Sequence, residues 1–266
     1  MLGKLMKYEF KATWKLIVPM EVFMIVMSLF AYASIRMAFY NSRNDLVEMT
    51  GAFVIMAYGL SMFVISVITV IYLIYRFYTS VYSDEGYLLH TLPVDKHHII
   101  ISKALVSAIW IIINIILIYL SIVFLLSSNK EAVEAIRDGF NYYFEIINRY
   151  KKINGFTVIM TLVASFIAMF ARILKITACI SLGQLSSNHK VLTSFGFYYG
   201  IYVAQRIFAM IYYTIITLAE RKSGSLTYTT SMIGSGWEFT LISSLIYCVI
   251  FYFLTWYVMD KKLNLD

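Results

Sequence analysis

Charged residues are scarce in this sequence. Asp, Glu, Lys and Arg make up only 14% of the 266 residues, whereas hydrophobic residues make up 61%. Soluble globular domains carry roughly a quarter charged residues, because polar side chains must cover their cores. The shortage therefore excludes a soluble domain and indicates an integral membrane protein. The net charge of +7 suits contact with anionic membrane lipid and does not require nucleic acid as a partner.

Motifs for catalysis and metal binding are also missing. The chain has no G-x-x-x-x-G-K-[ST] loop to hold nucleotide phosphates, no H-E-x-x-H and no paired C-x-x-C. Cys179 and Cys248 both lie inside apolar runs, so we expect no structural disulfide. His90, His97 and His98 share one polar stretch, but their spacing is not diagnostic of a metal site. We predict that the chain is not an enzyme and holds no cofactor or metal of its own.

Long apolar runs fill most of the chain. A helix needs about 20 mostly apolar residues to cross a bilayer. Stretches of this kind cover residues 16–36, 50–75, 104–127, 155–185, 193–218 and 239–259. We predict an all-α membrane protein with six transmembrane helices, forming a single transmembrane domain over residues 1–266.

The first fifteen residues have a different pattern. At helical spacing, one face carries Lys4, Lys7, Lys11 and Lys15, and the other carries Leu2, Leu5, Met6, Phe10, Trp14 and Ile17. This pattern predicts an amphipathic helix over residues 1–15 in the cytoplasmic headgroup layer. The lysines and the even number of spans place both termini in the cytoplasm, although the remaining basic residues are almost evenly divided between the two sides.

Two segments are expected outside the cell. Residues 128–152 begin with Ser128 three residues before Glu131, which is the spacing of a capping box, and continue with apolar residues at a helical period. We expect an amphipathic helix on the outer surface. Residues 220–238 are rich in Gly, Ser and Thr without a period and predict a flexible or re-entrant loop.

The connector between the second and third spans is unusually polar. It begins SDEGYLLHTLP, in which Ser83 can cap a helix whose first turn holds Asp84 and Glu85. Leu88, Leu89 and Leu92 give this helix an apolar side, and Pro93 ends it. These residues predict a short cytoplasmic helix over residues 83–93.

These elements together resemble the permease subunits of type 2 ABC exporters of Gram-positive bacteria. The resemblance is carried by MLGKLMKYEFKATWK, by YSDEGYLLHTLPVDKHHIIISK between the second and third spans, and by SLGQL at residues 181–185. In that family the N-terminal segment is an elbow helix, and the helix after the second span is a coupling helix seated in a separate ATP-binding subunit. The resemblance implies an ATPase contact formed by Ser83, Asp84, Glu85, Gly86, Tyr87, Leu88, Leu89, Leu92 and Pro93.

The resemblance also implies an assembly and a location. Two permease copies, identical or different, would join two cytoplasmic ATPases that bind ATP and Mg, in the bacterial cell membrane. By analogy the cargo is amphipathic, such as phenol-soluble modulins or antimicrobial peptides. The alternative function is a non-transporting membrane scaffold or sensor whose connector docks a cytoplasmic signalling protein.

A few charged residues interrupt the predicted spans. Arg206 lies near the middle of the fifth span, where a lone arginine costs at least ~2.5 kcal/mol. It is either a cationic spot in the translocation path or a structural partner of tyrosine hydroxyls or carbonyls at the subunit interface. We expect Arg172 and Lys175 to extend toward the cytoplasm by snorkelling. Glu21 is interpreted as a structural partner of the N-terminal helix or as a functional group.

Overall fold

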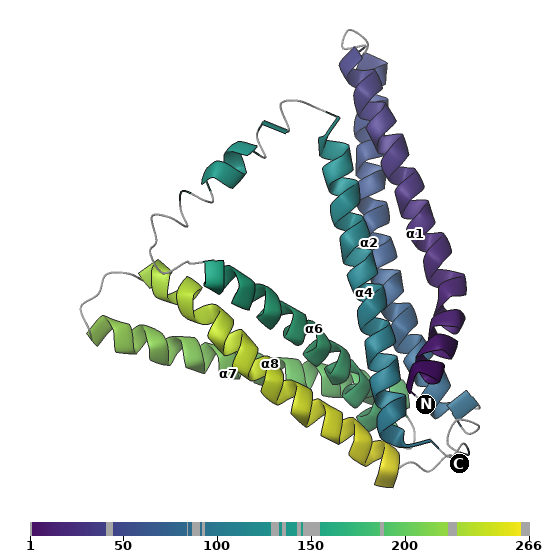
Figure 1. Ribbon diagram of the computed structural model, residues 1–266, viewed down its shortest axis with the longest axis vertical. Helices are drawn as coiled ribbons and strands as arrows, with labels where there is room; N and C mark the ends of the chain where they lie inside the picture. Colours follow the sequence, from purple (N-terminus) through teal and green to yellow (C-terminus); the bar gives the residue numbers. More distant parts are fainter. Residues whose placement is uncertain are drawn as a thin grey trace. The chain divides into compact units, whose positions relative to one another are not determined.

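The computed structural model describes residues 2–40, 45–83, 85–86, 91, 94–128, 133–134, 137–142, 145, 155–186, 189–222 and 228–261. Over these residues the chain is helical apart from turns and contains no strand, which confirms the all-α prediction. The long helices are α1 (Leu2–Tyr40), α2 (Asp45–Tyr82), α4 (Lys96–Leu126), α6 (Gly155–Gly183), α7 (Lys190–Lys222) and α8 (Tyr228–Lys261) (Figure 1).

Each of these six helices contains a segment long and apolar enough to cross a membrane. The segments are Leu2–Met37, Met49–Tyr82, Lys96–Leu126, Gly155–Gly183, Lys190–Leu218 and Gly236–Lys261. Many large apolar side chains are exposed, among them Phe30, Phe63 and Ile159, which suits contact with acyl chains. The six predicted spans are confirmed, and the chain is a multi-pass membrane protein.

The chain divides into two compact units. Unit 1 comprises Met1–Phe77 and Leu105–Phe144, and unit 2 comprises Tyr78–Ala104 and Glu145–Asp266. The last turn of α2 and the beginning of α4 therefore belong to unit 2, together with α6, α7 and α8.

Unit 1 is built by α1, α2 and α4 around a core of Ile17, Leu73, Val106 and Trp110. The indole Nε1 of Trp110 donates a hydrogen bond to the Thr13 hydroxyl at 2.8 Å. An apolar side chain buried between helices in this way excludes lipid and fixes their separation. The core thus anchors the N-terminal part of α1 against α2 and α4.

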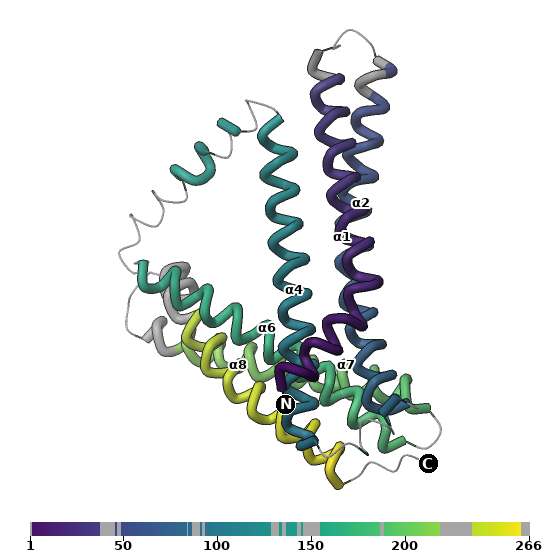
Figure 2. Tube along the Cα trace, turned by 45° about the vertical axis from the view of Figure 1, so that its right-hand side comes forward, coloured from purple at the N-terminus to yellow at the C-terminus, as the bar shows by residue number. Residues whose placement is uncertain are grey.

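The N-terminal segment is helical and forms the first part of α1. Its four lysines are exposed, and Phe10 packs on Trp110 with 5.1 Å between ring centroids. Pro19 lies inside the helix and lacks the amide hydrogen that would bond to the carbonyl of Lys15. Figure 2 shows the N-terminal part of α1 running at an angle to the rest of the helix, which is the bend that an internal proline favours.

Unit 2 is organised around α6, which packs against both α7 and α8. Small residues such as Ala171 and Ala178 are buried on α6, and they let neighbouring helices approach closely. On α8, Thr255 and Val258 are buried as well. Figure 1 shows α6 and α8 running side by side. The three helices present a common polar interior, described below.

The expectation of a loop over residues 220–238 is wrong for most of that range. Helix α7 continues to Lys222, and α8 begins at Tyr228. Gly, Ser and Thr have low intrinsic helix propensity, but that preference is weak compared with tertiary packing. Trp237 packs edge-on against Phe156 of α6 with 6.1 Å between centroids, and Phe239 stacks on Tyr212 of α7 at 4.2 Å. These contacts fix the beginning of the apolar part of α8.

Parts of the predicted outer segment at residues 128–152 are described. Residues 133–134, 137–142 and 145 are helical, and Phe140 and Tyr142 are exposed. Ser128 lies in a turn, where its amide donates to the carbonyl of Leu125 at 3.1 Å. Glu131 lies outside the described residues, so the capping box stays a prediction.

Candidate functional site

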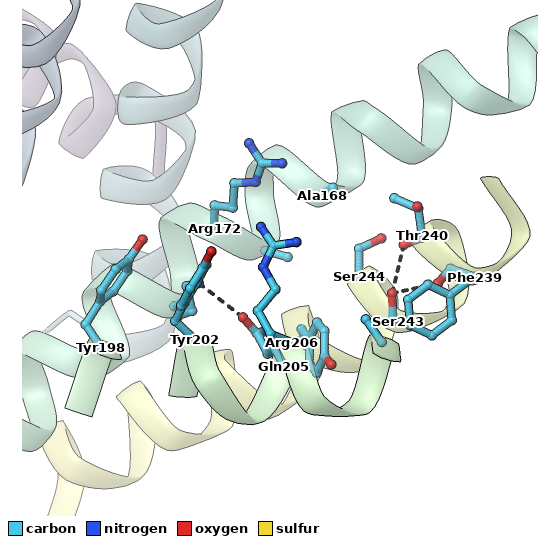
Figure 3. A pocket seen from close by; sticks show the side chains of 14 residues that line it. Ala168, Arg172, Tyr198, Tyr202, Gln205, Arg206, Phe239, Thr240, Ser243 and Ser244 are labelled. Atoms are coloured by element: carbon cyan, nitrogen blue, oxygen red, sulfur yellow. Dashed lines mark hydrogen bonds between the residues drawn. The ribbon is translucent and has the colours of Figure 1, made fainter. Parts of the chain in front are cut away.

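A polar cavity of about 470 Å³ lies within unit 2, between α6, α7 and α8 (Figure 3). Each helix contributes residues spaced three and four apart, which fall on one helical face. The lining residues are Ala168, Ala171, Arg172 and Lys175 of α6, Tyr198, Tyr202, Gln205, Arg206 and Ala209 of α7, and Phe239, Thr240, Ser243, Ser244 and Tyr247 of α8. We call this cavity the cationic pocket.

Three basic side chains line the cationic pocket. The Lys175 ammonium donates to the Gln205 side-chain carbonyl at 3.1 Å and lies 4.7 Å from the centroid of the Tyr198 ring. The guanidinium carbon of Arg206 lies 5.0 Å from the centroid of Tyr202. Figure 3 shows the guanidinium groups of Arg172 and Arg206 on the same side of the pocket. The tyrosine faces offset part of the charge through cation–π attraction.

No acidic residue among those that the structure describes neutralises this charge. None of the lining residues is Asp or Glu, and in the described part of the chain no ion pair joins Arg172, Lys175 or Arg206 to a carboxylate. Like charges at membrane depth repel one another strongly, because little solvent screens them. The cationic pocket therefore has an excess of positive charge. A bound anion, or water, would reduce the repulsion between its three basic side chains.

The expected snorkelling of Lys175 is wrong. The residue is 6% exposed, and its ammonium bonds to Gln205 of α7. Gln205 and the tyrosines of α7 give the ammonium the polar contacts that it would otherwise find at the interface. Arg172 also lines the pocket, whereas the sequence predicts that it extends to the interface. The signal that could have found this site is the presence of all three cations in two consecutive spans.

The position of Arg206 is compatible with both of its predicted roles. It lines a cavity, as a residue of a translocation path must, and it contacts a tyrosine ring, as a structural partner does. The ring belongs to Tyr202, one turn earlier on the same helix. That contact orients the side chain without joining α7 to another element.

A second buried polar group lies in unit 1. Glu21 is 4% exposed, and its Oε1 accepts a hydrogen bond from the Asn114 amide at 2.8 Å. Asn114 in turn accepts from the Ser66 hydroxyl at 3.3 Å, so the network links α1, α4 and α2. The partner of Glu21 is thus on α4 and not on the N-terminal segment. That segment has its own acid, Glu9, which pairs with Arg76 of α2 at 3.4 Å.

The predicted coupling helix lies mostly outside the described residues, which exclude Asp84, Tyr87, Leu88, Leu89, Leu92 and Pro93. At its start, the Ser83 hydroxyl donates to the carbonyl of Thr79 at 2.6 Å, and the Gly86 amide donates to the carbonyl of Ser83 at 2.7 Å. A Cβ added at Gly86 would lie 2.3 Å from the carbonyl oxygen of Val81, so this turn excludes larger residues. The ATPase contact stays a prediction.

Both flanks of this connector, residues 83–95, are tied to other helices of unit 2. Before it, Tyr82 donates to the Ser181 hydroxyl of α6 at 2.6 Å. After it, Lys96 pairs with Asp260 of α8 at 3.0 Å, and the imidazole of His97 bonds to the Tyr252 hydroxyl at 2.6 Å. The connector is therefore anchored on two of the three helices that line the cationic pocket.

The SLGQL segment at the end of α6 has two structural tasks. Ser181 receives the hydrogen bond from Tyr82, and Gly183 faces the beginning of α7. A Cβ at Gly183 would lie 2.6 Å from the Lys190 carbonyl oxygen and would also overlap the Ser194 side chain. Only glycine permits this close approach of α6 and α7.

No group of His, Cys, Asp and Glu in the described part of the chain could hold a metal ion. His97 and His98 lie in the first turn of α4, and His97 stacks on Trp256 of α8 with 5.3 Å between centroids. His97 therefore has a packing role.

Comparison with known proteins gives no match to a family model, to a curated protein or to a solved structure.

Proposed function

We propose that the chain is the membrane-spanning permease subunit of an ATP-driven exporter in the bacterial cell membrane. The observation that carries this proposal is the cationic pocket, a polar cavity within helices able to span a membrane. Charged groups are expensive at this depth and are kept where they line a path or a binding site. The resemblance to type 2 ABC exporter permeases supports the same function.

Energy for transport comes from a partner in this proposal. The sequence contains no phosphate-binding loop, so a separate cytoplasmic ATPase would bind ATP and Mg. The connector at residues 83–95 is the candidate docking segment, with Glu85 and Tyr87 in the predicted contact. A second permease copy, identical or different, completes the exporter.

The anchoring of the connector supports a route from the ATPase to the pocket. Because Tyr82, Lys96 and His97 are bonded to α6 and α8, a displacement of the connector acts directly on the helices that line the pocket. Packed helices transmit such displacements because their contacts are bistable and not freely deformable. The substrate proposed here is amphipathic, with phenol-soluble modulins and antimicrobial peptides as the best candidates.

The test is affinity capture of the tagged full-length chain from membranes, followed by measurement of ATPase activity in the eluate. We expect stoichiometric recovery of an ATPase that contains a phosphate-binding loop. Capture of a non-ATPase signalling protein in its place would support the scaffold or sensor alternative and overturn the exporter proposal.

A further inference from the structure

The depth of the three cations limits what can reach them. An α-helix rises about 1.5 Å per residue, so Lys175 and Arg172 lie roughly 12 and 17 Å along the helix from Gly183. Arg206 lies about 24 Å from Lys190 at the start of α7. With each candidate span centred in a hydrocarbon layer about 30 Å thick, Lys175, Arg172 and Arg206 would lie roughly 9, 5 and 3 Å along the helix from the middle of the layer. A ligand that reaches them from the bilayer needs an apolar part.

The donors in the pocket fit an oxyanion. The hydroxyls of Thr240, Ser243 and Ser244 already donate to carbonyls of their own helix, which leaves them as hydrogen-bond acceptors. The charged donors are the two guanidinium groups and the ammonium, and the Gln205 amide and the hydroxyls of Tyr198, Tyr202 and Tyr247 are neutral donors. Guanidinium groups bind carboxylate and phosphate through paired, charge-assisted hydrogen bonds. An anion between Arg172 and Arg206 would also relieve their mutual repulsion.

The size of the pocket and its surroundings favour a headgroup attached to a chain. A cavity of about 470 Å³ is large enough for a small polar headgroup. On other faces of α7, Phe208, Met210 and Ile211 are exposed at the level of the lining residue Ala209. An acyl chain leaving the pocket would meet an apolar helix surface and lipid.

We infer that the cationic pocket binds the negatively charged headgroup of a single-chain amphiphile, a carboxylate or a phosphate on an alkyl chain. Arg172 and Arg206 hold the headgroup through their guanidinium groups, and Lys175 fixes the inner wall through Gln205. That the amphiphile binds in the pocket follows from the pocket alone. That it is a transported substrate rests on the proposed function.

The experiment uses the full-length chain purified in a neutral maltoside detergent, without ATPase. Dodecyl phosphate and dodecanoate are titrated below micellar concentration, with thermal stability and native mass spectrometry as readouts. Dodecyltrimethylammonium and inorganic phosphate serve as the cationic and the chain-free probes. We expect both anionic amphiphiles to raise the melting temperature, because a ligand that binds only the folded state stabilises it. The two other probes should have no such effect.

Variants then locate the site. Arg172→Gln and Arg206→Gln should each weaken dodecyl phosphate binding roughly tenfold or more, since each removes charge-assisted hydrogen bonds. The matched control is Arg36→Gln, because Arg36 also lies over a tyrosine one turn earlier, Tyr32, but on α1, which contributes no residue to the lining of the pocket. Arg36→Gln should bind like the unaltered chain.

If the ligand-free Arg206→Gln variant is too unstable to purify, Arg206→Lys is used in its place. We expect Arg206→Lys to bind dodecyl phosphate with intermediate affinity, because it keeps the positive charge but loses the paired donors. Equal affinity of the pocket variants and Arg36→Gln would overturn the inference, as would equal binding of the cationic probe. If inorganic phosphate binds as strongly as dodecyl phosphate, the alkyl chain contributes nothing, and the pocket is a site for free anions. None of these outcomes depends on capture of an ATPase, so the inference and the proposed function can fail separately.

Discussion

Glu21 shows at the level of one residue how a buried acid can serve packing. Oε1 is bonded to Asn114, while Oε2 has no hydrogen-bond partner among the residues that the structure describes. Glu21→Gln keeps an acceptor for Asn114 and removes the charge, so we expect the melting temperature in detergent to stay the same or rise. Glu21→Ala should lower stability by about 1–3 kcal/mol, because it leaves the Asn114 amide buried without an acceptor.

Thermal melting of the two Glu21 variants beside the unaltered chain checks this prediction. Ser34→Ala is a suitable control, because Ser34 bonds only to its own helix at an exposed position. If Glu21→Gln proved as damaging as Glu21→Ala, the negative charge itself would be required, and the role of Glu21 would not be packing alone.

A substitution of Arg206 by a neutral side chain of similar length distinguishes its two predicted roles. Arg206→Met keeps much of the apolar stem but removes the guanidinium from the cationic pocket. If the residue lines the translocation path, assembly and basal ATP hydrolysis should persist while stimulation by substrate is lost. The measurement is ATPase activity of the captured complex with and without candidate peptides. Loss of folding or of dimer formation in this variant, with Arg36→Met unaffected, would instead assign Arg206 a structural role.

At the scale of elements, the connector is the segment whose function is most open to test. The first turn of the predicted coupling helix carries Asp84 and Glu85, and truncation of a hydrogen-bonded charge buried at an interface can cost 2–5 kcal/mol. We expect Glu85→Lys, or Tyr87→Ala combined with Leu88→Ala, to leave the chain in the membrane yet lose the ATPase on affinity capture. The readout is ATPase recovered per permease.

His98→Ala is the matched control for the connector variants, since His98 lies in α4 and its side chain is 43% exposed. His97 is less suitable, because it packs on Trp256 and bonds to Tyr252. Undiminished ATPase recovery with the variants at residues 85–88 would move the docking contact to another segment, with the turn at residues 185–190 as the next candidate.

Some elements could be predicted from sequence and others could not, for a physical reason. A membrane-spanning helix satisfies its backbone within one segment, so its apolar run is a local property, and all six spans were found. The start of α8 depends on aromatic contacts with α6 and α7, which the local Gly, Ser and Thr content does not reveal. The direction of Lys175 likewise depends on Gln205, a residue of the next helix. By contrast, Arg206 can be identified from the sequence alone, because a charged residue in the middle of a span is costly whichever residues surround it.

For the whole molecule, the orientation in the membrane gives the most direct prediction. The lysines at residues 4–15 favour the cytoplasm for the N-terminus, which places residues 128–152 outside. Asn141 is exposed, so Asn141→Cys should react with an impermeant thiol reagent in intact cells. Lys190→Cys, at the expected cytoplasmic end of α7, should react only after permeabilisation. The reverse pattern would invert the topology.

The anchors of the connector also set an order of events during synthesis. Tyr82 can form its hydrogen bond only after Ser181 has been synthesised, 99 residues later. The partners of His97 and Lys96, which are Tyr252 and Asp260, follow 155 and 164 residues later. Until α8 has been made and inserted, the segment proposed to meet the ATPase lacks its contacts with Tyr252 and Asp260. A nascent or truncated chain would thus present a loosely held connector, and an ATPase that prefers the fixed one would engage only finished permeases. If an ATPase docks on this connector, α8 would thus act as a completion check that limits ATP hydrolysis to fully made chains.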